Sequence, residues 1–464
     1  MQVLGNLRRY RWKELRLYII PLLILLLSMT QLLLADKDPH SSFSTKSLPA
    51  IQGLIPVIGL VGVLLATNIL LSFSPLRRAD QMLLPLVGLM SGIGMLMATR
   101  LGPDVGDPSQ GTRQLIWILA GIVLCMIVLF ALRNMRWLRR YYYVWALLGI
   151  ALVTVTLINT FHVGLGNLNS PTHDQLNIGP INFQPSELLK ICVVIFFAAV
   201  LAENSDIFSA GNLRIGPLRL PPVRQLVPIL MMLGIALLFF LFVRELGLAL
   251  LIYGIYLCMI YLGSGKFSYV AVGLVLFFLL GLVGYALFGY VRARFQAVTF
   301  NVLDWQNWTP DQTFFAENGG LQIVQGIIAL SSGGILGAGL GLGHPAFVPV
   351  AQSDMVFTAL GEEFGLAGLF GILGLYLFII YRGYRIAIES SDPFSKLLAS
   401  GLTSIFAIQT LIIVAGNMKF LPLTGIPLPF LSYGGSSIIA NYIIIGILLR
   451  ISYNNALERE GLAH

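Results

Sequence analysis

Three carboxylates follow a glycine-rich, nearly uncharged segment in the second half of the chain. Asp354 stands at the threshold of a long apolar run, and Glu362 and Glu363 lie inside that run. Acids are costly inside a bilayer, so their presence there indicates a function. Asp354 has the side chain of a general base or a metal ligand. The alternative is that Ser353 or Asp354 caps the helix that follows, and spacing alone does not separate the two.

The two glutamates differ in their direction on the expected helix. Glu362 lies eight residues after Asp354, which is roughly 80° around a helix that turns about 100° per residue. We therefore expect Asp354 and Glu362 to face one cavity, with a hydrogen bond to a neighbouring helix as the alternative for Glu362. Glu363 points away from Asp354, and we expect it to hydrogen-bond a neighbouring helix.

Basic side chains that suit phosphate occur in two further places. Glu187 and Lys190 are three residues apart at the start of an apolar run, so they share a helix face. Lys190 either forms a structural ion pair, with Glu245 as a candidate partner, or lines a cavity that holds phosphate. Arg292 and Arg294 follow another run. Arginine forks suit phosphate oxygens, and anchoring to lipid headgroups is the alternative.

Two glycine-rich segments allow backbone or helices to approach closely. The run from Ser331 to Gly341 lacks the GKS or GKT ending of a P-loop, so we expect no nucleotide there. The segment SYGGSS opens the last apolar run, where small residues favour tight helix packing. Its Ser432 hydroxyl is also a candidate ligand for a headgroup. No cluster of His and Cys predicts a zinc site, and we name no metal ligand.

The composition is that of an integral membrane protein. The 464 residues are 57% hydrophobic and 11% charged, with a mean hydropathy of +0.84, whereas soluble domains carry roughly 25% charged residues. Apolar runs near bilayer length number twelve. They are residues 17–34, 51–73, 82–99, 114–132, 142–160, 187–204, 225–243, 245–265, 268–290, 355–381, 397–416 and 434–449.

The basic residues predict the orientation of these runs. With the N-terminus inside, the inner segments hold 20 of the 29 Lys and Arg residues and the outer segments hold eight, while Lys190 lies within a run. This bias predicts an even number of helices with both termini in the cytoplasm. The net charge of +8 is thus a topology signal, and we expect no binding to nucleic acid.

Three of the outer loops stand out, and the largest covers residues 291–354. Its aromatic residues and the apolar stretch from Leu321 to Leu330 predict short interfacial or re-entrant helices within it. The second outer loop, 161–186, is rich in Asn, Pro and Gly, and the third covers 417–433.

Four segments together resemble the SEDS family of RodA/FtsW/SpoVE-like peptidoglycan glycosyltransferases. In order, they are FQPSELLK at 183–190, RELGLAL at 244–250, SSGG to GEEFG at 331–365 and PLTGIPLPFLSYGGSSIIAN at 422–441. The match covers roughly residues 140–455. It implies an all-α polytopic bundle with a ten-helix core. We therefore expect about twelve helices, with an N-terminal region 1–135 that includes two additional, peripheral spans and a catalytic membrane core 136–464.

The resemblance also implies roles for individual residues. The family's essential acid falls on Asp354, the Glu and Lys of its QPSE helix fall on Glu187 and Lys190, and the acid of its D-L-G motif falls on Glu245, a change from Asp. The segment before Asp354, AFVPVAQSD, lacks the acids that the family often has there. Asp354 is therefore the expected catalytic residue.

The activity that the resemblance implies is polymerisation of lipid II at the outer face of the bacterial cytoplasmic membrane, beside a class B penicillin-binding protein transpeptidase. The 4-hydroxyl of an acceptor GlcNAc attacks C1 of a donor MurNAc with inversion and expels undecaprenyl diphosphate. Asp354 would be the base, Glu362 would support the cavity, and Lys190, Arg292 or Arg294 would stabilise the diphosphate, with a divalent cation such as Mg²⁺ as a candidate cofactor. A lipid II flippase and a catalytically silent scaffold remain alternatives. The resemblance does not distinguish elongation from division or sporulation.

Overall fold

The computed structural model is mostly helical and contains two short antiparallel hairpins. It describes residues 11–35, 51–163, 176–178, 181–203, 213–215, 218–220, 234 and 245–461. Within these residues, ten helices are long and apolar enough to cross a membrane. The protein is thus a multi-pass helical membrane protein.

The chain forms two compact units, each assembled from separate stretches of sequence. The first consists of Met1–Ala131, Asn301–Arg382 and Pro427–His464, and the second of Leu132–Phe300 and Gly383–Ile426. The predicted division at residue 135 into an N-terminal region and a core remains an interpretation of the sequence.

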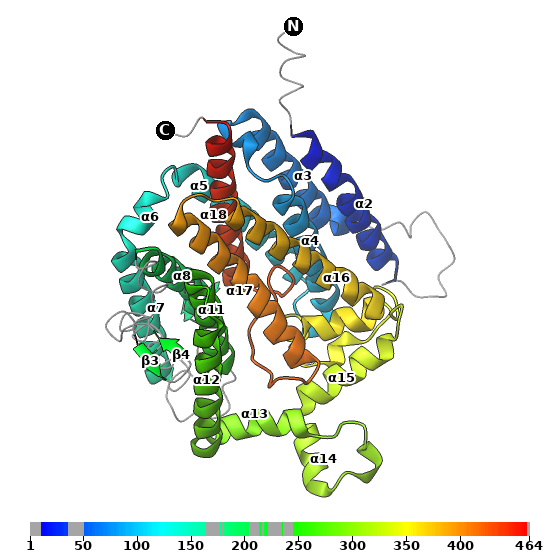
Figure 1. Ribbon diagram of the computed structural model, residues 1–464. Coiled ribbons are helices and arrows are strands. Elements are labelled where there is room, and N and C mark those ends of the chain that lie inside the picture. Colours follow the sequence, from blue (N-terminus) through cyan, green and yellow to red (C-terminus); the bar gives the residue numbers. More distant parts are fainter. Residues whose placement is uncertain are drawn as a thin grey trace. The chain divides into compact units, whose positions relative to one another are not determined.

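Six long helices form most of the described first unit (Figure 1). They are α2 (Trp12–Ala35), α3 (Ile51–Phe73), α4 (Leu83–Leu101), α5 (Gln110–Ala131), α16 (Val356–Ile388, which enters the second unit after Arg382) and α18 (Gly435–Arg459). Shorter elements are η2 (Pro75–Arg78), η3 (Pro103–Val105), η5 (Trp305–Asn307), α14 (Pro310–Glu317), α15 (Leu321–Gly333) and η6 (Pro345–Phe347).

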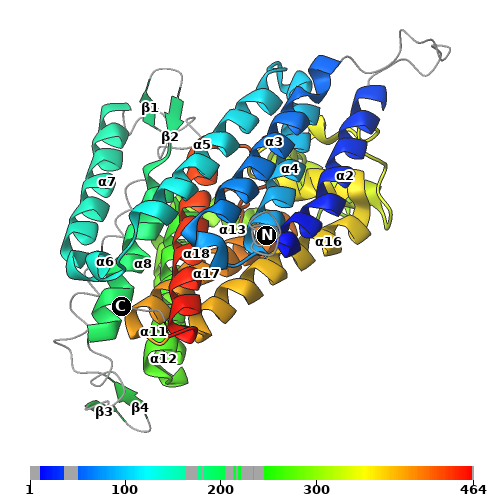
Figure 2. The same cartoon turned by 90° about the horizontal axis from the view of Figure 1, so that it is seen from above.

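The long helices of the first unit pack closely with their neighbours. Figure 2 shows α2, α3, α4 and α5 as neighbouring helices, and α5 lies along α18. On α2, Leu25 and Met29 are buried while Leu23 and Leu27 are exposed. A helix that is apolar on both sides suits a position with the protein on one side and lipid on the other. Between α4 and α18, the hydroxyls of Ser91 and Tyr442 form a buried hydrogen bond of 3.0 Å.

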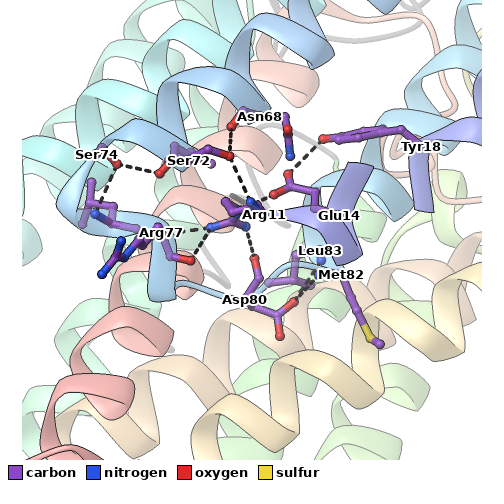
Figure 3. Close-up of polar contacts among 12 residues, drawn as sticks. Arg11, Glu14, Tyr18, Asn68, Ser72, Ser74, Arg77, Asp80, Met82 and Leu83 are labelled. Atoms are coloured by element: carbon purple, nitrogen blue, oxygen red, sulfur yellow. Dashed lines mark hydrogen bonds and ion pairs between the residues drawn. The ribbon is translucent and has the colours of Figure 1, made fainter. Parts of the chain in front are cut away.

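A buried charge network joins the start of α2 to the turn between α3 and α4 (Figure 3). The guanidinium of Arg11 pairs with Glu14. It also donates to the main-chain carbonyls of Leu76, Arg77 and Asp80, the last at 2.8 Å. Arg11 thereby bonds carbonyls at the end of η2 and in the turn after it, where the Leu76 carbonyl also accepts the amide of Ala79 at 3.0 Å.

Asp80 holds the same turn through its side chain. One carboxylate oxygen accepts the amides of Met82 at 2.8 Å and Leu83 at 3.0 Å, where α4 begins. The other oxygen pairs with Arg382 of α16. Buried charges are stable only when they are paired and hydrogen-bonded. The network therefore ties α2 and α3 to α4 and α16.

The second unit packs its helices around α8 (Pro185–Glu203), whose residues are buried almost throughout. Helices α7, α11 and α17 contact it. The described elements of this unit are α6 (Arg136–Arg140), α7 (Tyr142–Val163), α11 (Leu246–Ser264), α12 (Phe267–Leu287), α13 (Gly289–Thr299) and α17 (Pro393–Asn417), with the strands β1 (Leu176–Ile178), β2 (Ile181–Phe183), β3 (Leu213–Ile215) and β4 (Leu218–Leu220). Leu176 pairs with Phe183 in one hairpin and Leu213 with Leu220 in the other.

The prediction of twelve spans is borne out in part. Ten of the runs match helices of membrane-spanning length, and residues Tyr142–Ile158 of α7 form a shorter apolar helical stretch. All but residue 234 of the run 225–243 and most of the loop 161–186 lie outside the described residues. The large loop contains helices α13, α14 and α15, as its apolar and aromatic content predicts.

Candidate functional site

Asp354 lies in a turn that precedes α16 and is half-buried. The amides of Thr358 and Ala359 donate to the carbonyl of Met355, at 3.1 and 3.2 Å. Met355 therefore directly precedes the helix, and the alternative that Ser353 or Asp354 caps it stays open. Because Asp354 is outside the helix, the projection that placed Glu362 roughly 80° around from it does not apply.

The turn that carries Asp354 is held by residues near the start of α18. The hydroxyl of Ser432 donates to the carbonyl of Ser353 at 2.6 Å and accepts the amide of Leu428 at 2.7 Å. The amide of Tyr433 donates to the carbonyl of Gln352 at 2.8 Å. Ser432 is 1% exposed, and its hydroxyl already has partners on both sides. These bonds fix the backbone beside Asp354, and the predicted contact of Ser432 with substrate stays a prediction.

The backbone on both sides of this contact is strained. Val350 has φ +58° and Phe430 has φ +66°, a region that side chains with a Cβ rarely adopt and that is especially unfavourable for a β-branched residue. Such conformations persist only where the surrounding contacts impose them, and they cluster at functional sites.

Helix α16 is broken at Gly365, which has φ +66° and ψ −173°. The glycine-rich segment after α15 fills the break with main-chain hydrogen bonds. The amides of Ala338 and Gly339 donate to the carbonyls of Glu362 and Glu363 at 2.9 and 3.0 Å. On the other side of the break, the amides of Leu366 and Ala367 donate to the carbonyls of Gly334 and Ile335, both at 3.0 Å. Backbone groups freed by the break are thus satisfied, as an apolar environment requires.

This interlock explains why the segment is rich in glycine. A Cβ added to Gly337 would lie 2.2 Å from the carbonyl oxygen of Glu363, and one added to Gly365 would lie 2.2 Å from the amide nitrogen of Gly337. Both residues also have positive φ. The close approach predicted for the glycine run is therefore an approach to the broken helix.

The two glutamates before the break bind different groups. Glu362 accepts the main-chain amide of His344 at 2.7 Å, so its carboxylate holds the segment that leads to Asp354. Glu363 is buried and pairs with Arg100 of α4, at 3.1 Å between Nε and Oε1. The prediction that Glu363 bonds a neighbouring helix is confirmed. The predicted cavity role of Glu362 stays a prediction.

Glu187 and Lys190 come together in the second unit, on the first turns of α8. The Lys190 ammonium donates to Glu187 Oε2 at 2.7 Å and to Gln409 Oε1 of α17 at 3.0 Å. Lys190 is fully buried. The structural ion pair is thus present, with Glu187 as the partner that the structure shows, whereas a contact with phosphate stays a prediction. Glu245 is buried directly before α11.

The two arginines of the large loop lie on α13. Arg292 is exposed, with its guanidinium 5.8 Å from the centre of the Tyr285 ring and bonded to the carbonyl of Ala286. Arg294 donates to the carbonyl of Leu423 at 2.7 Å, so it anchors the third loop to α13. Lys419 of that loop contacts the carbonyl of Phe300, and burial lowers the pKa of this lysine.

Arg100 and Gln409 are polar site residues that the sequence reasoning did not single out. Like Arg292, Arg100 is a basic residue on the predicted outer side of the membrane, where basic residues are few. That position could have marked it as a candidate. Gln409 lies in an apolar run and gave no such signal. Among the described residues, no group of three or more His, Cys, Asp and Glu side chains is placed to hold a metal ion.

Fold and site together define a multi-pass helical membrane protein that presents one carboxylate on a braced turn before a broken helix. Comparison with known proteins names the group. The chain belongs to the SEDS family, the cell cycle proteins related to FtsW, RodA and SpoVE, which it matches over residues 79–457. Helices α2 and α3 precede the matched residues.

Individual relatives agree with this assignment. The chain is 39% identical over 380 residues to the peptidoglycan glycosyltransferase RodA of Mycobacterium tuberculosis strain H37Rv, covering 81% of this chain and 78% of the relative. It is 32% identical over 345 residues to the probable peptidoglycan glycosyltransferase FtsW of Geobacter metallireducens, covering 73% and 84%. The fold is similar to that of a chain in a solved peptidoglycan synthase complex that coordinates polymerization and crosslinking. The TM-score is 0.60 and the sequence identity is 23%, with 81% of this chain and 98% of that chain covered.

Proposed function

We propose that this protein is a peptidoglycan glycosyltransferase that polymerises lipid II at the outer face of the bacterial cytoplasmic membrane. The observation that carries the proposal is the bracing of Asp354. Main-chain contacts fix the residues on its N-terminal side, and the helix that follows it is locked to a glycine-rich segment. A base must be held in a defined position to remove a proton, and this turn provides that.

In the proposed reaction, Asp354 accepts the proton of the acceptor 4-hydroxyl as that oxygen attacks C1 of the donor. The bond from C1 to the diphosphate oxygen breaks, and undecaprenyl diphosphate leaves with the electron pair. A single displacement inverts the anomeric centre. Because diphosphate is already a good leaving group, this reaction needs no counterpart of the carboxylic acid that glycosidases use to protonate the leaving oxygen.

Stabilisation of the diphosphate belongs to basic side chains in this proposal. Lys190, Arg292 and Arg294 are the predicted candidates. Of these, Arg292 has the exposed guanidinium, whereas Arg294 donates to Leu423 and Lys190 is paired with Glu187. A guanidinium can bind two phosphate oxygens at once. We therefore place Arg292 first among the three.

Mg²⁺ enters the proposal as a cofactor bound mainly by the substrate. This ion is usually held by one or two carboxylates together with phosphate oxygens and water. Asp354 supplies one such carboxylate, while the described residues form no larger group of metal-binding side chains. A bound cation would offset charge on the diphosphate. The role of Asp354 as a base does not depend on it.

We propose a class B penicillin-binding protein as the partner. Support comes from the similar chain that belongs to a peptidoglycan synthase complex coordinating polymerization and crosslinking. We also propose that both termini face the cytoplasm, on the strength of the 20 inner and eight outer basic residues.

The test is polymerisation of labelled lipid II by the purified protein, with and without its transpeptidase partner. The wild type should yield glycan strands. Asp354→Asn and Asp354→Ala should yield none while keeping the wild-type melting temperature in detergent. The matched control is Asp311→Asn, which changes an exposed acid in the same large loop and should retain full activity.

The outcomes separate the alternatives. Glycan strands made by Asp354→Ala at the wild-type rate would remove Asp354 from the chemistry. A wild-type protein that makes no strands but moves lipid II between the leaflets of a vesicle would be a flippase. One that does neither, yet raises the activity of the transpeptidase, would be a scaffold.

A further inference from the structure

Arg100, at the end of α4, contacts three separate parts of the first unit. Its Nε donates to Glu363 at 3.1 Å, Nη1 to Asp104 at 2.7 Å and Nη2 to the main-chain carbonyl of Gly343 at 2.9 Å. Asp104 lies just beyond α4, whereas Glu363 and Gly343 are distant in sequence. A planar guanidinium has five N–H donors in fixed directions, so it can serve all three acceptors at once.

The two distant acceptors belong to the elements that carry Asp354. Glu363 lies two residues before the break in α16, and Gly343 begins the segment that leads to Asp354. The next residue of that segment, His344, donates its amide to Glu362. Adjacent loop residues are therefore bound to adjacent helix residues, once directly and once through Arg100.

We propose that Arg100 is a positioning residue that fixes the start of segment 344–354 against the broken helix and so sets the place of the Asp354 carboxylate. Ser432 holds the other end of this segment. The effect on catalysis rests on the function proposed above, whereas the effect on the segment itself does not.

A positioning role differs from simple charge balance. Glu363 is buried and paired with Arg100, so removal of Arg100 alone leaves a buried carboxyl without this partner. Removal of both charges cancels that penalty but does not restore the bond to the Gly343 carbonyl. The two explanations therefore predict different results for a double variant.

The experiment compares Arg100→Gln, Arg100→Lys and the double variant Arg100→Gln/Glu363→Gln. We expect Arg100→Gln to lower kcat for lipid II polymerisation between about tenfold and a hundredfold, because a shift of about 1 Å in a reacting group has that effect. KM should change little, since substrate contacts are kept. The double variant should regain melting temperature but not kcat. Arg100→Lys, with one compact ammonium, should fall between wild type and Arg100→Gln.

Hydrogen exchange supplies a readout that needs no activity. Amides of residues 344–354 should exchange faster in Arg100→Gln and in the double variant than in the wild type, while those of α5 should not. Arg385→Gln is the control, because Arg385 forms an exposed pair with Glu389. It should leave kcat and exchange unchanged.

Two results would overturn the proposal. One is wild-type exchange in segment 344–354 for Arg100→Gln. The other is full recovery of kcat in the double variant, which would reduce Arg100 to a counter-ion of Glu363. If the wild type itself makes no polymer, the proposed function fails, while the exchange data still decide whether Arg100 fixes the segment. If Arg100→Gln does not fold, Arg100→Lys and the double variant carry the same comparison.

Discussion

At the scale of single residues, the contacts of neighbouring residues define the place of Asp354. Ser353 is bonded to Ser432, Gln352 is bonded to Tyr433, and Val350 is held at positive φ. Each contact acts on main-chain atoms, so it determines where the backbone lies whatever the side chains do. A catalytic carboxylate on such a turn is held in place before substrate arrives, which reduces the cost of ordering it later.

Ser432→Ala tests this arrangement at one atom. The substitution removes the bond to the Ser353 carbonyl and leaves the Leu428 amide without its partner. Unsatisfied buried groups of this kind cost about 1–3 kcal/mol, so the melting temperature in detergent should fall. We expect kcat for polymerisation to fall as well, with a smaller change in KM.

The control for this prediction is Ser331→Ala. Ser331 is exposed, and its hydroxyl bonds only the carbonyl of Ile327 one turn earlier in α15. Its loss should leave activity intact. Equal effects of the two substitutions would argue against a positioning role for Ser432.

At the scale of elements, the broken helix and the glycine-rich segment are two halves of one structure. Neither satisfies its backbone alone, because the break frees carbonyls before Gly365 and amides after it. The segment supplies partners for both. The chain then continues from Gly341 to Asp354 and into the first part of α16. The interlock therefore fixes both ends of this connection, its start after the glycine-rich segment and the helix that follows it.

Gly365→Ala should disrupt this interlock. The conformation of Gly365 alone costs a residue with a Cβ about 1–3 kcal/mol, and the added atom would also overlap Gly337 and Ile335. We expect a clear loss of melting temperature together with loss of polymerisation.

Gly371→Ala, on the same helix, is the matched control. Nothing lies within 4 Å of a Cβ added there, and alanine favours a helix by about 1 kcal/mol over glycine. This variant should be neutral or slightly more stable. A stable, active Gly365→Ala protein would show that the break is not required.

The sequence predicted the helices well and their contacts poorly. Long apolar runs identify spans because the bilayer sets their length, and a motif resemblance pointed to Asp354. The break at Gly365 was missed because the run 355–381 contains several glycines, and the sequence does not show which of them leaves the helical conformation. The Arg100–Glu363 pair joins residues 263 positions apart, and local spacing holds no information about such a contact. Spacing could not decide whether Asp354 is a base or a cap, because helix starts are uncertain by a residue or two.

At the scale of the whole molecule, the N-terminal helices are tied into their unit. Helices α2 and α3 precede the residues that match the family, yet Arg11, Glu14 and Asp80 join them to α4 and α16 through buried charges. Removing one partner of such a network costs more than the pair contributes, because a buried charge is left alone. The two spans are therefore additional to the matched family core without being loosely attached.

The proposed reaction also depends on which side of the membrane each loop faces. Cytoplasmic segments retain Lys and Arg because these residues resist translocation. The large loop should thus be outside and the connection before α17 inside. Single-cysteine variants test this in intact cells with a membrane-impermeant maleimide, after replacement of Cys125, Cys192 and Cys258. Asp311→Cys should be labelled and Lys396→Cys should not, both being exposed positions. The reverse pattern would place Asp354 on the cytoplasmic side. It could not then act as the base of a polymerase that works at the outer face.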